Sequence, residues 1–249
     1  MQFCLCFRSP GAVLVLLLCA ASVPTRADTA IETETAQIGV RGESNFSQSF
    51  EFEHAADGSG QGTLTQYEYG ISDRAEILIE PFFYVHLKPN DGPSTSGVGD
   101  LEITPSYMVV REAASTPAVL LAFKVKVPTA SKDVEGTGKF DYYPYLIFGK
   151  HLGGWTFNAN LGVNFAQPVD ENIYHQDLVW DLEAEHRFAP RFTMFFEAFS
   201  AEDGVKTIST SAEYQFTAHL NGFFVMSRTE EHSNIARVGF NYGFGTGRN

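Results

Sequence analysis

Carboxylates recur at alternate positions in several segments of this 249-residue chain. The segment DLVWDLEAE, residues 177–185, places Asp177, Asp181, Glu183 and Glu185 on one face and mostly apolar residues on the other. Alternate residues of a β-strand point to opposite sides of the sheet, so these acids would share one side. Carboxylates fixed around an enclosed watery path favour cations and neutral solutes over anions. The pattern therefore suggests a selective passage.

The same alternation predicts which side chains line this path if the apolar faces contact lipid. We expect Lys124 and Lys126 to pair with acids on the opposite side of the path. Aromatic residues on the same face either line an apolar part of the path or fill space. The lumen-facing candidates are the acids Glu51, Glu53, Glu68, Glu76, Glu80, Glu102, Asp141, Asp177, Asp181, Glu183, Glu185, Glu197 and Glu213, the bases Lys124, Lys126, Lys139 and Arg237, and the aromatics Phe82, Tyr84, Tyr143, Tyr145, Phe195 and Phe199.

Enzymatic chemistry has little support in the sequence. There is no Gly-x-Ser-x-Gly elbow and no His-Glu-x-x-His pair. The nearest metal-like clusters are Glu230-Glu231-His232 and Glu183–His186. On a strand, Glu185 and His186 would point to opposite faces, which prevents them from sharing a metal. We expect no enzymatic activity, no cofactor and no metal site.

Twelve segments alternate in this way and are separated by turn residues. They lie near 48–56, 62–70, 75–87, 98–110, 117–128, 139–150, 155–167, 175–188, 191–200, 206–217, 221–229 and 234–244. Short turns such as Ser72-Asp73 alternate with longer loops such as Lys88–Gly97. An even number of strands of about ten residues with this loop asymmetry is typical of an outer-membrane barrel. The predicted fold is all-β, an antiparallel transmembrane β-barrel of about 12 strands.

Two features complicate this prediction. A soluble β-sandwich gives similar alternation and remains an alternative fold. Pro81, Pro105 and Pro144 fall inside predicted strands. A closed barrel has no edge strand where a missing N–H goes unnoticed, so we expect these prolines at bulges or strand ends.

The first 27 residues have the features of a secretory signal peptide. An apolar run, Gly11–Ala21, follows Arg8, and Thr25-Arg26-Ala27 offers a small-residue cleavage site. All three cysteines lie in this segment, so thiol chemistry and disulfides are excluded after its removal. We expect residues 28–47 to be an N-terminal lead-in or the start of the first strand, and residues 48–249 to form the barrel.

The net charge of −13 is a further constraint, because it argues against nucleic acid as a partner. Removal of residues 1–27 would take away Arg8 and Arg26 but no acid. The exported chain would therefore be still more acidic.

Five short motifs occur in a characteristic order: Glu68–Arg74, Gly97–Leu101, Val127–Thr129, Gly149–Gly153 and Asn158–Gly162. With them the chain resembles the outer-membrane transporter family named for the meta-cleavage pathway of phenol degradation, over about Thr63 to Phe244. The resemblance implies an outer-membrane barrel that passes small, often hydrophobic or aromatic molecules. The last strand, with Val238, Phe240, Tyr242 and Phe244 alternating with small or polar residues, resembles the signal that barrel-assembly machinery reads.

Taken together, these patterns predict a channel or transporter in the outer membrane of a Gram-negative bacterium, passing small solutes through a narrow acidic lumen. Its expected partners are outer-membrane lipid, a small-molecule solute and, during insertion, barrel-assembly machinery. One alternative is a structural or adhesive barrel whose acidic loops bind divalent cations. Another is a soluble periplasmic sandwich that binds an apolar ligand.

Overall fold

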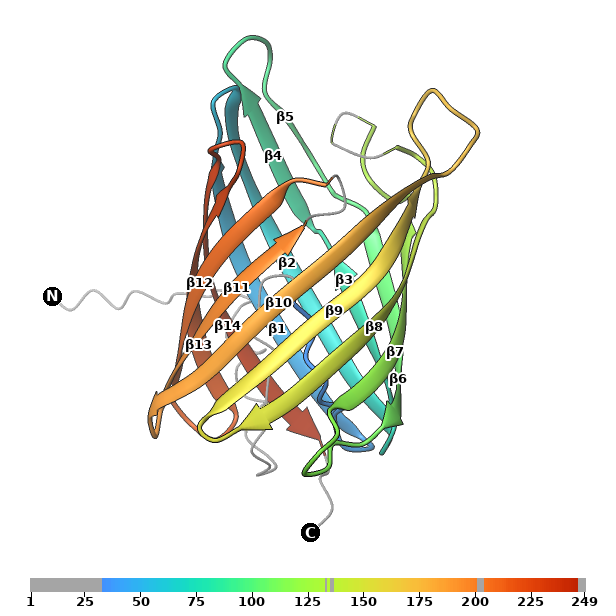
Figure 1. The fold of residues 1–249 in the computed structure, drawn as a ribbon. Helices are drawn as coiled ribbons and strands as arrows, with labels where there is room; N and C mark the ends of the chain where they lie inside the picture. The colour runs from blue at the N-terminus through green and yellow to red at the C-terminus, as the bar shows by residue number, and fades with distance from the viewer. Residues whose placement is uncertain (1–32, 133, 135–136, 201–203, 246–249) are drawn as a thin grey trace, which may run out of the picture.

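The computed structural model describes residues 33–132, 134, 137–200 and 204–245, and the predicted signal peptide lies outside these residues. The regular elements within these ranges are fourteen strands (Figure 1). No described helix is long and apolar enough to cross a membrane. The strands are β1 (Glu43–His54), β2 (Gly58–Ser72), β3 (Ala75–Pro81), β4 (Tyr84–Pro89), β5 (Thr95–Gly97), β6 (Leu101–Val110), β7 (Ala118–Val127), β8 (Asp141–Leu152), β9 (Trp155–Ala166), β10 (His175–Ala189), β11 (Phe192–Ser200), β12 (Lys206–Gln215), β13 (Leu220–Thr229) and β14 (Asn234–Gly245).

The strands form one antiparallel sheet that closes on itself. β1 pairs with β14 on one side and with β2 on the other, so no edge remains at this position. β3 and β4 both pair with the same side of β2, and their partners β6 and β5 continue in the same way. β3 and β4 are thus two parts of one interrupted strand, and so are β5 and β6. The fourteen segments therefore form a twelve-strand barrel. The predicted barrel is confirmed, and the alternative of two packed sheets is wrong.

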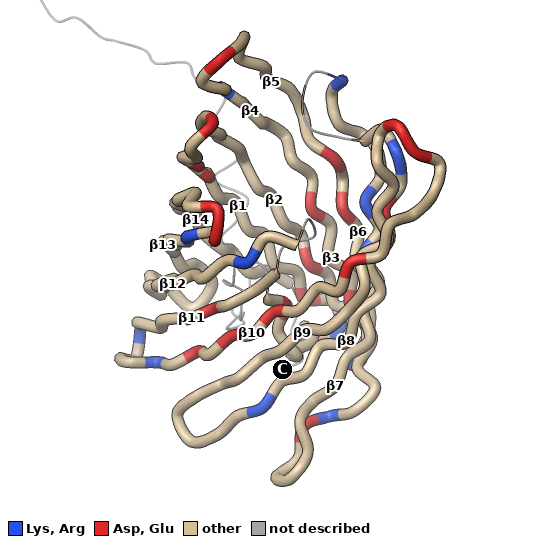
Figure 2. The backbone as a smooth tube through the Cα atoms, turned by 45° about the horizontal axis from the view of Figure 1, so that its top comes forward, with Lys and Arg blue, Asp and Glu red and all other residues tan. Residues whose placement is uncertain are grey.

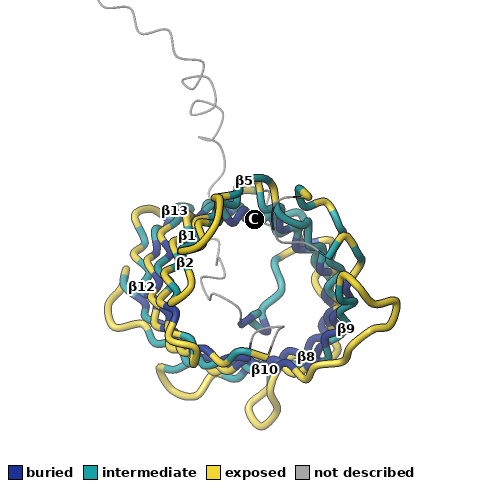
Figure 3. The backbone as a smooth tube through the Cα atoms, turned by 90° about the horizontal axis from the view of Figure 1, so that it is seen from above, coloured by how far each residue is buried: buried dark blue, intermediate teal, exposed yellow. Residues whose placement is uncertain are grey.

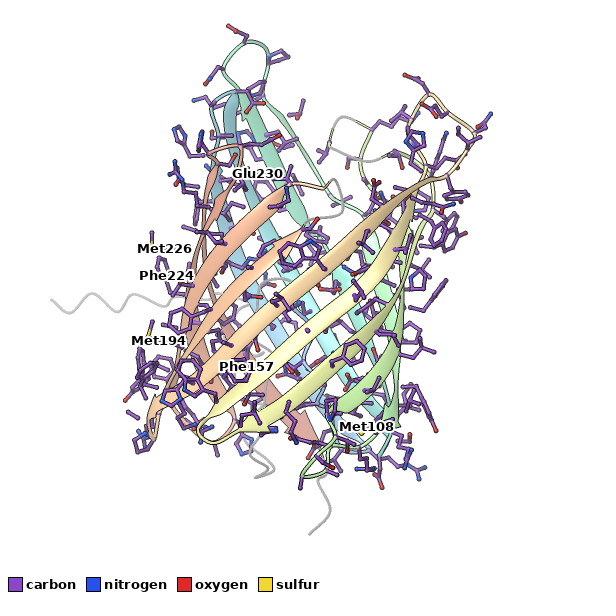
Figure 4. All side chains as sticks on the ribbon, in the orientation of Figure 1. Met108, Phe157, Met194, Phe224, Met226 and Glu230 are labelled. Carbon is purple, nitrogen blue, oxygen red and sulfur yellow. The ribbon has the colours of Figure 1, made fainter. Side chains whose placement is uncertain are left out.

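Side chains alternate between the interior and the outer surface along each strand. On β10, Leu178 and Leu182 are 64% and 53% exposed, whereas Asp181 and Glu183 between and beside them are 5% and 3% exposed. Figure 4 labels Phe224 and Met226, which project outward from β13. An apolar outer band around a polar interior is the arrangement that a lipid bilayer stabilises.

The interruption between β3 and β4 changes which residues face inward. Glu68 of β2 pairs with Leu78, but Thr63 of the same strand pairs with Tyr84, a register that differs by one residue. The extra residue lies just after Pro81, which ends β3. A one-residue slip moves every following side chain to the other face. Tyr84 therefore lies on the outer surface, and its predicted position in the lumen is wrong.

Pro105 and Pro144 lie within strands, unlike Pro81. The pairings around them are missing from the β6–β7 and β8–β9 ladders, yet the register is the same on both sides. Both prolines are neighbours of Phe123 on β7, because Phe123 pairs with Pro144 and stands opposite Pro105 in the β6–β7 register. The barrel therefore tolerates them by locally lost hydrogen bonds and not by bulges.

The two ends of the barrel differ in their connections. Tight turns join β2 to β3, β8 to β9 and β10 to β11 at one end, whereas the longer connections from β7 to β8 and from β9 to β10 lie at the other. In outer-membrane barrels the short turns are periplasmic. We call this the short-turn end and the opposite one the long-loop end.

One carboxylate fixes the β6–β7 turn at the short-turn end. Glu112 accepts hydrogen bonds from the His151 backbone N–H at 2.9 Å and the His151 ring at 2.5 Å, and it pairs with Lys150 Nζ at 3.0 Å. These donors stabilise the charged carboxylate, chiefly the His151 side chain, and they lower the pKa of Glu112 from 4.5 to about 2.

This lowered pKa makes the turn sensitive to acid. The stabilisation is fully present above about pH 4.5 and is lost as the pH falls towards 2, because the unfolded carboxyl takes up its proton first. Hydrogen exchange of the His151 amide should therefore be slower in the wild type than in Glu112→Gln at pH 6, with the difference shrinking at pH 3. An equal exchange rate in both proteins at pH 6 would contradict this coupling.

Candidate solute path

The N-terminal segment, residues 33–42, lies inside the barrel. Its backbone N–H groups donate to polar groups on the wall: Thr33 to Glu197 Oε1 at 3.2 Å, Ala36 to Asn158 Oδ1 at 3.3 Å and Gly39 to Glu76 Oε2 at 2.9 Å. At the short-turn end, Gly42 donates to the Gly70 carbonyl at 2.8 Å. These partners belong to β2, β3, β9 and β11, so the segment crosses the interior (Figure 3). It continues directly into β1, to which residues 43–47 belong.

One side of this segment packs against an apolar patch on the inner wall. Ala36 is 5% exposed, and Ile38 packs beside it against the same cluster. The wall contributes Met108, Ala118, Leu120, Ala122, Tyr143, Tyr145, Ile147 and Val179, which we call the inner apolar patch. The aliphatic members are not among the predicted lumen-facing residues, because only charged and aromatic side chains give a recognisable signal for a solute path in the sequence.

A second inward apolar cluster lies on other strands. It consists of Phe199 on β11 with Phe223 and Val225 on β13. Along β10 and β11, Asp181, Glu183 and Glu197 are buried on the inner face between the two clusters. Glu183 accepts a hydrogen bond from Asn158 Nδ2 at 2.8 Å. Figure 2 marks further acidic positions on β2, β3 and β6. The interior thus combines apolar surfaces with buried carboxylates.

The basic side chains pair with acids on adjacent strands. Lys124 Nζ lies 3.0 Å from Glu102 Oε2, and Lys126 contacts Asp141 on β8. In these two contacts the acid lies on an adjacent strand and not across the barrel as predicted, because the register places Glu102 and Asp141 opposite Lys126 and leaves Glu102 within reach of Lys124. Arg237 on β14 binds Glu51 on β1 with Nε at 3.0 Å and Nη2 at 2.5 Å.

The remaining predicted residues differ in how far the protein covers them. Buried on the inner face are Glu80, Asp141, Asp181, Glu183, Glu197, Tyr143, Tyr145, Phe195, Phe199 and Arg237, and partly buried are Glu51, Glu53, Glu68, Glu76, Phe82, Glu102, Lys124, Lys126, Glu185 and Glu213. Tyr143 and Tyr145 stack with their ring centroids 4.5 Å apart. Asp177 is exposed near the long-loop end of β10.

Lys139 does not lie in a strand. Its ammonium donates to the Pro168 carbonyl at 2.9 Å and also contacts the Glu171 carbonyl, so it ties the β7–β8 loop to the β9–β10 loop. The predicted position of Lys139 on the luminal face of a strand is therefore wrong, because β8 begins only at Asp141.

The β7–β8 loop folds back over the inner face of β5. Ser131 N–H donates to the Val98 carbonyl at 2.9 Å, and Ala130 N–H donates to Asp100 Oδ1 at 2.8 Å. A Cβ added to Gly97 would lie 2.5 Å from Ser131, so only glycine leaves room for the loop. The loop thereby covers the inner face of β5 at the long-loop end.

The glycines of two other motifs make room for the N-terminal segment. A Cβ at Gly149 would lie 2.5 Å from Ala36 Cβ, and one at Gly70 would collide with the Val40 carbonyl. Each motif thus marks a place where a segment without regular structure touches the barrel wall. The glycine-rich motifs indicate places where another segment comes close to the barrel wall, but they do not indicate which segment it is.

A cavity of about 750 Å³ opens between the N-terminal segment and the wall near the short-turn end. Its lining mixes acids such as Glu68, Glu185 and Glu213 with Arg187 and Arg191. Within the described residues no group of three His, Cys, Asp or Glu side chains could hold a metal ion.

The sequence of this barrel matches a known family. The family is described as "Putative MetA-pathway of phenol degradation", and the match covers residues 56–246. The chain belongs to this family. No curated protein matches the chain.

Solved structures of outer-membrane barrels share the fold. An outer membrane channel from Pseudomonas putida F1 has a TM-score of 0.62 at 14% identity, with 88% of this chain and 100% of that one covered. A KdgM porin in complex with disordered oligogalacturonate has a TM-score of 0.57 at 13% identity, covering 80% and 99%. A NanC porin has a TM-score of 0.57 at 11% identity, covering 79% and 98%. The family member described here thus has the fold of an outer-membrane porin or channel.

Proposed function

We propose that this family member is an outer-membrane channel that passes small hydrophobic or aromatic solutes through a narrow acidic lumen. The proposal rests chiefly on one observation: the interior of a closed barrel carries two apolar clusters with buried carboxylates between them. The first cluster packs against Ala36 and Ile38 of the N-terminal segment, whereas Phe195 lines the 750 Å³ cavity and offers a solute an apolar contact. The family description, which names phenol degradation, supports aromatic solutes.

Two features favour a narrow passage. Twelve strands lie between small barrels filled by side chains and the sixteen to eighteen strands of open porins. The N-terminal segment and the β7–β8 loop then occupy part of the interior. We therefore expect slow or selective passage, with apolar side chains that line the 750 Å³ cavity, such as Phe195, contacting the solute and the carboxylates disfavouring anions.

Liposome swelling tests this proposal. Aryl glucosides are suitable probes, because protein-free bilayers admit them poorly whereas they admit phenol readily. Phenyl glucoside should enter proteoliposomes faster than sucrose, and carboxyphenyl glucoside should enter more slowly than phenyl glucoside. Phe195→Asn, at a ring that lines the 750 Å³ cavity, should reduce the preference for phenyl glucoside while sucrose entry stays unchanged. A barrel that admits none of these solutes is not a channel, and a structural or adhesive role would then be the better explanation.

A further inference from the structure

The outer surface of β8–β11 contains a hollow that the solute path does not use. Phe148, Phe157, Leu182 and Phe196 surround it, and the hollow has a volume of about 550 Å³. Figure 4 labels Phe157 on the front of the barrel, where β9 crosses the view. This volume is within the range of sites that hold small molecules in proteins, about 300–1,000 Å³.

The hollow arises from alternating large and small residues in two neighbouring rows. One row runs Phe148, Ala159, Leu182, Ala198 across β8–β11, and the next runs Lys150, Phe157, Ala184, Phe196. Each alanine stands between two larger side chains, since Ala198 is followed on β12 by Ile208, so Ala159, Ala184 and Ala198 form a floor. The floor exposes little but apolar atoms and backbone groups that are already paired in the sheet.

An aromatic pair closes the hollow towards the short-turn end. Trp155 stacks on His186 with ring centroids 4.5 Å apart, and it also lies 6.2 Å from Phe157 and 6.5 Å from Phe196. Aromatic residues at this level of a membrane barrel mark the boundary between hydrocarbon and headgroups. The hollow therefore lies in the hydrocarbon region, just inside this boundary.

We propose that this hollow binds one acyl chain of a phospholipid from the leaflet at the short-turn end. The hollow is continuous with the apolar outer band of the barrel, so in the membrane lipid is the material beside it. Three rings and Leu182 give a chain a shaped, preorganised surface instead of a smooth one. The site is independent of the proposed passage of solutes, because it lies on the opposite face of the wall.

The charged side chain beside the hollow indicates that the site does not select lipids by their headgroup. Lys150 Nζ lies at the rim, but it pairs with Glu112 Oε1 at 3.0 Å and donates to the Ala113 carbonyl at 2.6 Å. An ammonium held by two acceptors contributes little to binding a phosphate. Recognition should therefore depend on the acyl chain, with phosphatidylglycerol and phosphatidylethanolamine binding alike.

Trp155 provides a built-in reporter for the experiment. The chain contains two tryptophans, so Trp180→Phe leaves Trp155 alone beside the hollow. The folded barrel in detergent is titrated with phosphatidylglycerol or phosphatidylethanolamine carrying bromines at mid-chain, which quench nearby tryptophan. We expect saturable quenching by both lipids at the same concentration, and no saturable phase with a brominated detergent.

Filling the hollow should remove this signal. Ala184→Phe places a ring between Phe157 and Phe196, and Ala198→Phe fills the neighbouring floor position. Both should abolish saturable quenching. Ala236→Phe is the matched control, since Ala236 pairs with Phe52 and Met226 on the outer face of β14, away from the hollow, and it should quench like the wild type. Heat-dependent gel migration verifies that each variant is folded.

Three results would overturn the proposal. Wild-type quenching that rises linearly with the lipid fraction would show that no site exists. Saturable quenching that persists in folded Ala184→Phe and Ala198→Phe would place the site elsewhere. Saturation by phosphatidylglycerol alone would show that the headgroup, and not the chain, is recognised.

Discussion

Deletion of residues 33–40 is expected to raise the single-channel conductance of the barrel severalfold. The segment crosses the interior and donates hydrogen bonds to Glu76, Asn158 and Glu197. Its removal widens the path and exposes two carboxylates that its N–H groups now bind. Cation selectivity should therefore increase together with conductance. Planar-bilayer recordings with a salt gradient measure both quantities.

A point substitution provides an independent version of this experiment. Gly149→Val should displace the segment, because a Cβ at this position would already lie 2.5 Å from Ala36. Gly153→Ala is the control, since Gly153 lies in the β8–β9 turn and an added Cβ there meets nothing within 4 Å. The positive φ of 64° at Gly153 strains an alanine, so its folding is checked first. Unchanged conductance in both the deletion and Gly149→Val would mean that the segment does not limit flow.

Lys126→Met is expected to destabilise the barrel by about 3 kcal/mol, since removal of one partner leaves a buried charge uncompensated. Lys126 contacts Asp141, which is 4% exposed and accepts a hydrogen bond from the Gln167 N–H at 3.0 Å. The free energy of unfolding follows from the urea midpoint in lipid vesicles.

Two further variants test whether the loss of stability in Lys126→Met comes from the burial of the ion pair. Adding Asp141→Asn to Lys126→Met should restore most of the loss, because the amide carries no charge and its oxygen can still accept from Gln167. Lys206→Met removes the same side chain from a pair with Glu230 whose side chains are 63% and 47% exposed. This loss should be about 0.5 kcal/mol or less. Equal losses at Lys126 and Lys206 would contradict the argument.

The sequence was sufficient to predict the barrel because strand periodicity is a local property. Residues 155–165 alternate apolar residues with polar residues or glycine, and they lie in β9. Tyr84 shows the limit of this reasoning: alternation continued through Pro81 predicts an inward side chain, but one extra residue before β4 reverses the face. No side-chain pattern in Pro81-Phe82-Phe83 reveals such a slip.

The N-terminal segment could not be predicted for a different reason. It has no periodicity, and the backbone N–H groups of Thr33, Ala36 and Gly39, which bind it to three strands of the wall, could come from almost any residue. Its docking site is visible only in the wall, where Gly70 and Gly149 leave space. Interactions that use the backbone leave little trace in the segment that makes them.

The pairing of β1 with β14 has a consequence for biogenesis. Arg237 and Glu51 are 186 positions apart, and their bond spans the junction of the first and last strands. Contacts this distant in the chain form slowly, because a long loop must close first. Until β14 arrives, β1 presents unsatisfied amide and carbonyl groups, which invite pairing with a neighbouring polypeptide. A factor that accompanies the newly made chain must therefore cover the unpaired edge of β1 until β14 pairs with it. The bond between Arg237 and Glu51 then closes this junction, and the protection is no longer needed.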